Sequence, residues 1–228
     1  KRSAQFSKLS REITVAAKMG MPDPNMNPRL RLAVNAARAE NMPKDNIERA
    51  IKKGTGDLEG VEYVEVTYEA YGPGGVALMI QALTDNPTRT VAEVRAKLSR
   101  GGGNLGTTNS VAFMFDRKGQ IFVPAGGLDE DSAMEKALEA GAEDFAKDED
   151  AFVITTVPSD LHAVKAALEA AGLKADQAEL SWIPKSTVRV EGKDADALLK
   201  LIEAIEELDD VQKVDANFDM DESAMAGA

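Results

Sequence analysis

The spacing of apolar residues changes once along this chain, and the change restricts the folds open to it. Up to about residue 56, apolar side chains recur every three or four residues, which is the spacing of one helix face. After "GTGDLEG", residues 64–70 alternate apolar and polar side chains, with Glu65 and Glu69 on the polar face of a half-buried strand. The sequence therefore predicts a helical N-terminal domain followed by α+β structure.

The first 56 residues predict three short helices. "FSKLSREITVAAKMG" stops at Gly20 and Pro22, and the helix in "NPRLRLAVNAARAE" has Asn27 as its N-cap and Pro28 in its first position. The third helix begins near Pro43, and Gly54 and Gly56 end it. Short amphipathic helices with short links pack as a three-helix bundle.

The remaining chain predicts two α+β domains. Residues 119–183 follow the order β-α-β-β-α-β, which is ferredoxin-like, and "SVAFMFDRKGQIFV" predicts two strands around a "DRKG" turn. The strand "STVRVEG", a helix and the strand "VQKVDANF" are too few to stand alone, so residues 184–228 are expected to complete the domain begun in 57–118. "DMDESAMAGA" is expected to be a mobile tail. The fold class is α+β multidomain, with domains 1–56, 57–118 plus 184–228, and an inserted 119–183.

Charge is divided unevenly between these regions. Residues 1–56 hold 12 Lys or Arg and 5 Asp or Glu, whereas residues 57–228 hold 15 and 34. A basic domain in an acidic chain is typical of nucleic-acid binding, and the acidic part favours solubility or a protein partner. The candidate phosphate-binding residues are the cations on the outer faces of the helices: Lys8, Arg11, Lys18, Arg31, Arg38, Arg49, Lys52 and Lys53.

Helix-end electrostatics explain only part of this set. Lys52 and Lys53 lie in a last turn, where cations offset the helix dipole, but Arg31 and Arg38 lie mid-helix. Aromatic residues make up 5% of the chain, and only Phe6 lies among the basic helices, on the apolar face. The sequence therefore indicates phosphate-backbone contact rather than base stacking.

A glycine-rich segment, "GGGNLG" at 101–106, formally matches a dinucleotide-binding pattern. It follows a helix and precedes a strand, the reverse of the order that pattern needs. It therefore indicates a helix cap with a flexible loop or, alternatively, a loop that approaches phosphate or RNA. The candidate contact residues of this loop are Arg100, Gly101, Gly102, Gly103 and Asn104.

Catalytic and metal chemistry find little support in the residues. The chain has no Cys and one His, His162, and its acidic clusters at 129–131 and 148–150 fit turns and helix starts. No nucleophile–base pair emerges, so we expect no enzyme activity, no cofactor and no metal. No apolar run reaches the length of a membrane span, and no signal-peptide pattern is present, so the expected location is cytoplasmic.

Several long segments resemble the YebC family. They include "NPRLRLAVNAARAENMPKDNIERAIKKGTG", "YEAYGPGGVA", "LTDNPTRTVAEVR" and "GGNLGTTNSVAFMFDRKG". The resemblance implies a three-helix domain followed by two α+β domains, one inserted in the other. It also implies a DNA-binding transcriptional regulator or, as in organellar and some bacterial members, a translation factor acting at ribosomes on proline-containing stretches.

Three functions stay open from the sequence. The first is a non-enzymatic regulator that binds DNA, and the second is a ribosome-associated factor whose cations grip ribosomal RNA. The absence of a base-reading recognition helix slightly favours shape-based or RNA binding. The third is an acidic module that docks on a protein partner. The oligomeric state is not indicated.

Overall fold

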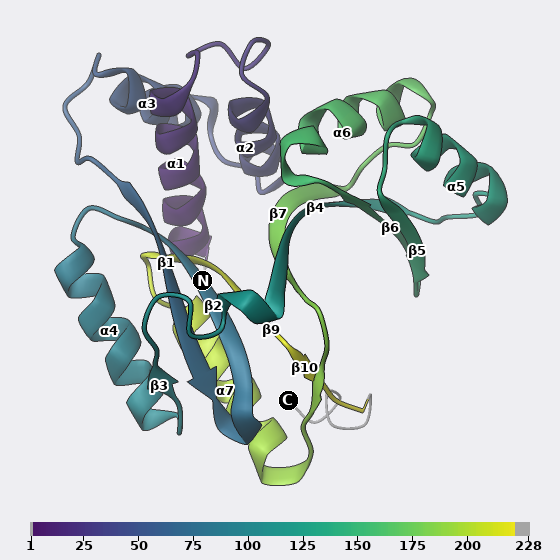
Figure 1. Ribbon diagram of the computed structural model, residues 1–228. Helices are drawn as coiled ribbons and strands as arrows, with labels where there is room; N and C mark the ends of the chain where they lie inside the picture. The colour runs from purple at the N-terminus through teal and green to yellow at the C-terminus, as the bar shows by residue number, and fades with distance from the viewer. Residues whose placement is uncertain (1, 222–228) are drawn as a thin grey trace. The chain divides into compact units, whose positions relative to one another are not determined.

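The computed structural model describes residues 2–221, which divide into two compact units (Figure 1). Unit 1 combines the chain up to Phe115 with the chain from Pro184 onward, and unit 2 is Asp116–Ile183. The protein is therefore an α+β multidomain chain in which one unit interrupts the other in sequence. Among residues 2–221, no helix combines the length and the apolar character needed to cross a bilayer.

Three helices open unit 1, as the apolar spacing predicts. They are α1 (Arg2–Met19), α2 (Pro28–Ala39) and α3 (Lys44–Thr55). Asn27 caps α2, because its side-chain oxygen accepts a hydrogen bond from the backbone N–H of Leu30 at 3.0 Å. The apolar faces meet in one core, which includes Ile13, Leu30, Val34, Ile47 and Ala50.

Two glycines at the end of α3 are needed for different structural reasons. Gly54 lies inside the helix and does not end it, because α1 passes so closely that a Cβ on Gly54 would lie 2.4 Å from the Thr14 carbonyl oxygen. Gly56, with φ of 86°, is the left-handed residue that ends the helix. The glycine signal thus reports close helix packing at one position and termination at the other.

The rest of unit 1 is a four-stranded sheet covered by two helices. The strand order is β3-β1-β2-β9, with bounds β1 (Val64–Gly72), β2 (Val76–Thr84), β3 (Asn104–Leu105) and β9 (Val211–Ala216). The helices are α4 (Pro87–Arg100) and α7 (Gly192–Glu206), and short 3₁₀ turns lie at Pro73–Gly75 and Ala112–Met114. Leu78 and Ile80, on one face of β2, share a core with Leu98 of α4 and Leu198 of α7. Both helices therefore cover that face.

Glu69 corrects the prediction of an acidic solvent face on β1. Its carboxylate is buried and accepts backbone N–H bonds from Asn109 (2.6 Å), Val111 (3.0 Å) and Ala112 (2.7 Å). Burial would raise the pKa of Glu69, but these three bonds outweigh it and lower the pKa below the ordinary value. The side chain anchors the loop after β3, a role that strict alternation does not reveal.

Unit 2 is one sheet with two helices. Its elements are β4 (Phe115–Pro124), α5 (Glu130–Glu139), β5 (Asp144–Asp148), β6 (Ala151–Thr156), α6 (Leu161–Ala170) and β7 (Gln177–Pro184), with a 3₁₀ turn at Pro158–Asp160. The strand order β5-β6-β4-β7 is the ferredoxin-like order. The buried core includes Ile121, Phe152 and Ile154 from the strands and Ala137 and Leu168 from the helices.

Two local predictions are wrong, and a third, the mobile tail, is contradicted only in its first residues. "DRKG" is not a turn but part of the continuous strand β4, where Gly119 permits close pairing because a Cβ there would lie 2.3 Å from the Thr156 hydroxyl oxygen. The segment "STVRVEG" supplies only β8 (Val188–Arg189), which pairs with β10 (Phe218–Asp219) outside the main sheet. The tail begins ordered, since Asp219 lies in β10 and Met220 is buried; residues 222–228 of that tail lie outside the described residues.

Candidate nucleic-acid interface

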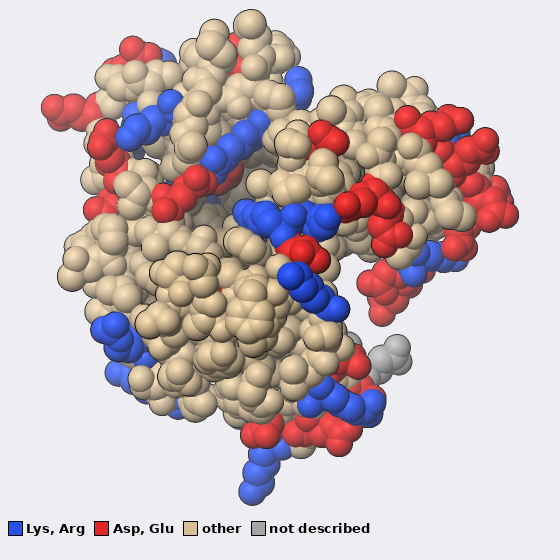
Figure 2. All heavy atoms as spheres, in the orientation of Figure 1, with Lys and Arg blue, Asp and Glu red and all other residues tan. Residues whose placement is uncertain are grey.

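Five of the eight predicted cations are exposed on α2 and α3. Arg31 and Arg38, seven residues apart, share one face of α2, and Arg49, Lys52 and Lys53 lie within one turn of α3. Across residues 2–221, none of these five forms a recorded ion pair. Their charges are therefore available to a ligand, in contrast to unit 2, where red acidic atoms gather over α5 (Figure 2).

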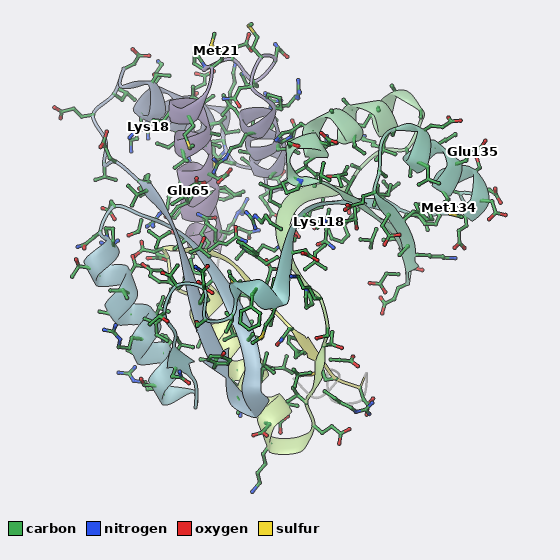
Figure 3. The ribbon with its side chains drawn as sticks, in the orientation of Figure 1. Lys18, Met21, Glu65, Lys118, Met134 and Glu135 are labelled. Atoms are coloured by element: carbon green, nitrogen blue, oxygen red, sulfur yellow. The ribbon has the colours of Figure 1, made fainter. Side chains whose placement is uncertain are left out.

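The three predicted cations of α1 are already engaged. The Lys8 ammonium donates to the backbone carbonyl of Glu206, and its burial lowers the pKa of Lys8. Lys18 pairs with Glu62 at 3.0 Å, and both side chains are exposed (Lys18 is labelled in Figure 3). Arg11 is the most enclosed, with 12% of its side chain exposed. The prediction that Lys8 and Arg11 lie on a solvent face is wrong, because this side of α1 packs against the sheet domain of unit 1.

Arg11 binds the sheet domain through Asp210. Its Nη1 donates to Asp210 Oδ1 at 2.5 Å and to the Leu83 carbonyl at 2.9 Å, and its guanidinium carbon lies 5.1 Å from the centre of the Tyr63 ring. The hydroxyl of Thr90 also donates to Asp210, at 2.7 Å. Arg11 therefore acts as a structural tie between α1 and the sheet.

Asp210 is the centre of this cluster. Its side chain is 2% exposed, and Arg89 also donates to both carboxylate oxygens, at 3.0 and 3.1 Å from Nη2. Burial alone would raise the pKa of Asp210, but hydrogen bonds from Arg11, Thr90 and Arg89 outweigh it and lower the pKa. The carboxylate is thus held ionised inside the fold.

Arg29, a cation that the sequence reasoning did not select, is also used structurally. It donates to Glu12 from Nε at 2.8 Å and to Glu65 from Nη2 at 2.6 Å (Glu65 is labelled in Figure 3). Burial opposes the charge, but the two carboxylates raise the pKa of Arg29 above its ordinary value. Because Arg29 is paired with neighbouring Glu residues, it does not belong with the five unpaired cations.

The glycine loop has packing reasons for its composition. A Cβ on Gly101 would lie 2.7 Å from Leu201 Cδ1, and one on Gly103 would lie 2.3 Å from the Tyr71 carbonyl oxygen. Gly102 has φ of 82°, and Asn104 begins β3, which pairs with β1. Arg100 and Asn104 remain exposed, so the loop stays a secondary candidate contact.

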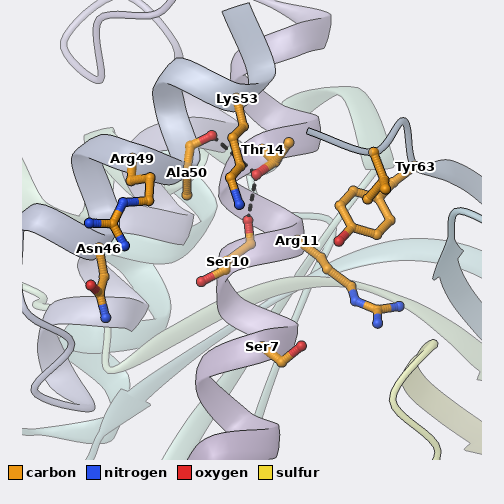
Figure 4. Close-up of a pocket in the computed structure, with 10 residues that line it drawn as sticks. Ser7, Ser10, Arg11, Thr14, Asn46, Arg49, Ala50, Lys53 and Tyr63 are labelled. Atoms are coloured by element: carbon orange, nitrogen blue, oxygen red, sulfur yellow. Dashed lines mark hydrogen bonds between the residues drawn. The ribbon is translucent and has the colours of Figure 1, made fainter. Parts of the chain in front are cut away.

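A pocket of about 340 Å³ lies between α1 and α3, beside the segment that leads into β1 (Figure 4). Arg11, Arg49 and Lys53 line it, together with polar side chains that the sequence reasoning missed. A row of hydroxyl side chains lies on α1, formed by Ser7, Ser10 and Thr14 at spacings of three and four residues. This spacing is the feature of the sequence from which the row could have been predicted. Asn46 and Tyr63 complete the polar lining.

Metal ligation has no support in the part of the chain that the structure describes. No group of three or more His, Asp or Glu side chains there is arranged to hold an ion. The chemistry on offer at the helical domain is therefore anion binding by ammonium, guanidinium and hydroxyl donors.

The chain combines a basic helical domain with two α+β regions. Comparison with known protein families identifies the class of protein that has this combination. Residues 1–57 match the "TACO1/YebC protein N-terminal domain", and residues 63–218 match the "TACO1/YebC second and third domain". The chain belongs to the TACO1/YebC family.

Named relatives and one solved structure agree with this membership. A "probable transcriptional regulatory protein" of Gemmatimonas aurantiaca is 66% identical over 228 residues, covering 100% of this chain and 92% of the relative. One from Chlorobaculum tepidum is 53% identical, covering 99% and 90%. The crystal structure of a conserved hypothetical protein from Aquifex aeolicus is 50% identical, with a TM-score of 0.89 over 97% of this chain and 91% of that one.

Proposed function

We propose that this chain is a non-enzymatic regulator of gene expression that binds the phosphate backbone of nucleic acid through its helical domain. The observation that carries the proposal is the set of five exposed, unpaired cations on α2 and α3, in a domain with 12 Lys or Arg against 5 Asp or Glu. The relatives' printed name, probable transcriptional regulatory protein, supports regulation as the outcome. The proposal places the protein in the cytoplasm, where DNA and ribosomes are both within reach.

A salt series tests the proposal. Fluorescence anisotropy measures binding of a labelled DNA duplex by the native protein and by the triple variant Arg49→Gln, Lys52→Gln, Lys53→Gln. Each lost phosphate contact lowers the slope of log K against log salt by about 0.9, so the variant binds more weakly and with a flatter slope.

The matched control changes three exposed cations outside the helical domain: Lys147→Gln, Lys174→Gln and Lys193→Gln. It alters net charge equally and is expected to keep the native slope. If both variants lose the same amount of DNA affinity, the effect is one of net charge only. If the triple variant keeps the native DNA affinity, α3 is not part of the interface.

A ribosome-associated translation factor is the second candidate, and the form of the interface supports it. Arg38, Lys52 and Lys53 lie in the last turns of α2 and α3, away from the helix N-termini that read bases in a helix-turn-helix motif. Such a surface suits the shape-based recognition common for structured RNA. Co-sedimentation with ribosomes in the presence of excess duplex DNA distinguishes the two candidates. If the protein stays bound to ribosomes, the translation factor is favoured; if DNA displaces it, the DNA-binding regulator is favoured.

Unit 2 supports a protein contact as an additional, separate proposal. It contains 6 Lys or Arg against 15 Asp or Glu, and α5 exposes Met134 and Leu138 beside acidic side chains (Met134 and Glu135 are labelled in Figure 3). This contact would not compete with nucleic acid, because like charge repels the phosphate backbone.

A further inference from the structure

The pocket between α1 and α3 differs from the surrounding surface in its charge. Its lining includes two unpaired cations, Arg49 and Lys53, and no Asp or Glu, although the whole chain has 39 acidic and 27 basic residues; Arg11 also lines it, but its charge is already paired with Asp210. Arg49 and Lys53 lie four residues apart on α3, so both can reach the same point from one side. A recess with this lining favours an anion over a cation or an apolar group.

The pocket also contains hydrogen-bond donors that the fold leaves unused. The Thr14 hydroxyl is engaged, since its contacts are the carbonyl oxygen of Ser10 on the same helix (2.9 Å) and that of Ala50 (3.1 Å), which links α1 to α3 (Figure 4). By contrast, the structure records no bond for the Ser7 or Ser10 hydroxyl within residues 2–221.

Arg11 lines the pocket, but its guanidinium extends away from Arg49 and Lys53 and is bound to Asp210 (Figure 4). Its Nε is buried and has no hydrogen-bond acceptor among the described residues, although its Nη1 is fully used by Asp210 and Leu83. Charged donors surrounded by hydroxyls are the chemistry that binds phosphate oxygens.

We propose that this pocket is a specific site for one phosphoryl group of a nucleotide, with the attached sugar against Val61 and Tyr63. Its volume, about 340 Å³, lies at the low end of the range for small-molecule sites, which suits a single nucleotide rather than a duplex. This inference rests on the proposed function for the identity of its ligand, since the phosphoryl group can come from an RNA chain or from a free nucleotide. It goes further in assigning one pocket to one phosphate.

Two matched substitutions test the pocket separately from the surface. Asn46→Glu introduces a carboxylate into the pocket lining, in the first turn of α3, where an acid also favours the helix dipole. Asn35→Glu introduces the same charge on α2, four residues from Arg31 and three from Arg38, outside the pocket. Both positions are exposed and both new acids lie near an arginine, so their general effect on polyanion binding is matched.

The experiment measures AMP and inorganic phosphate binding by calorimetric titration, and binding of a single-stranded RNA oligonucleotide by anisotropy. We expect Asn46→Glu to weaken AMP and RNA binding roughly tenfold or more, because charge-assisted bonds are lost and a repulsive charge is added. Asn35→Glu is expected to leave AMP binding unchanged and to weaken RNA binding by less than Asn46→Glu does, because it affects only the surface arginines. Loss of phosphate and AMP binding with RNA unaffected would identify a free-nucleotide site, whereas loss of RNA alone would identify a site for a chain phosphate.

The failures are distinguishable. If Asn46→Glu and Asn35→Glu behave alike on every ligand while RNA still binds, the pocket inference is overturned and the proposed function stands. If the native protein binds neither RNA nor the DNA duplex but binds AMP in a way that only Asn46→Glu abolishes, the proposed function fails and the pocket stands. Ser10→Glu, compared with Ser3→Glu two turns away on α1, repeats the test from the other wall and decides the matter if Asn46→Glu does not fold.

Discussion

The substitution Asp210→Asn tests the tie between the helical domain and the sheet of unit 1. The carboxylate is 2% exposed and accepts hydrogen bonds from Arg11 at 2.5 Å and Thr90 at 2.7 Å. Asparagine keeps the shape but removes the charge, so Arg11, only 12% exposed, stays inside the fold without its counter-ion. Breaking one partner of a buried pair costs about 3–5 kcal/mol, and partial access of water to the arginines favours the lower end. A loss of about 3 kcal/mol lowers the melting temperature by about 6–12 °C.

Calorimetry at neutral pH measures this loss, and Asp209→Asn is the matched control. Asp209 is the adjacent residue, exposed, and without a recorded hydrogen bond within residues 2–221, so its substitution is expected to change stability little. Equal melting temperatures for the two variants would refute the assignment of Asp210 as a buried anchor.

The pH dependence provides a second check. Since the folded-state pKa of Asp210 lies below the ordinary value of 3.8, its contribution is fully present above pH 3.8. The contribution is lost as pH falls through the lowered folded-state pKa. The gap between the native protein and Asp210→Asn should therefore be constant from pH 7 to about 4 and narrow in stronger acid. A gap that widens on acidification would contradict an ionised buried Asp210.

Three further substitutions probe other parts of the fold. Glu69→Gln replaces an acceptor of three backbone N–H groups with a side chain that has one oxygen. We expect a loss of stability of about 1–3 kcal/mol and faster hydrogen exchange in the 109–112 loop. Unchanged exchange in that loop would exclude the role of Glu69 as its anchor. Gly54→Ala places a Cβ 2.4 Å from the Thr14 carbonyl oxygen; the expected cost is about 1–3 kcal/mol by thermal melting, and an unaffected protein would show that the helices separate freely. Phe152→Ala leaves a cavity in the core of unit 2 and is expected to lower stability by about 3–5 kcal/mol. Hydrogen exchange should accelerate in β4 and β6 and not in β1. A uniform increase in exchange would indicate that the two units unfold together.

The sequence predicted the elements better than their edges. Asn27 before Pro28 identified a helix start, because local capping chemistry depends on neighbours in the chain. Glycine is a less reliable signal: the sequence predicts that Gly54 ends a helix and that Gly119 lies in a turn, yet both allow close approach of a second element. That second element is distant in sequence, so the reason for each glycine is not local.

The candidate site shows the same limit. Arg11 and Arg31 look alike in sequence, since each is an arginine on the polar face of an amphipathic helix. Arg31 is exposed, whereas Arg11 is bound to Asp210, 199 residues further along the chain. A helical period identifies which side chains leave the helix core; it does not tell which of them meets another domain.

Composition and spacing by themselves determined the fold class, the helical start of the chain and the concentration of positive charge there. These properties depend on residue type and on contacts a few positions apart, which a sequence displays directly. Only the tertiary structure decided which cations are free, because pairing of Arg11, Lys18 and Arg29 depends on carboxylates carried by other elements. It also formed the pocket, since the row of hydroxyls on α1 becomes a recess only where α3 and Tyr63 stand beside it.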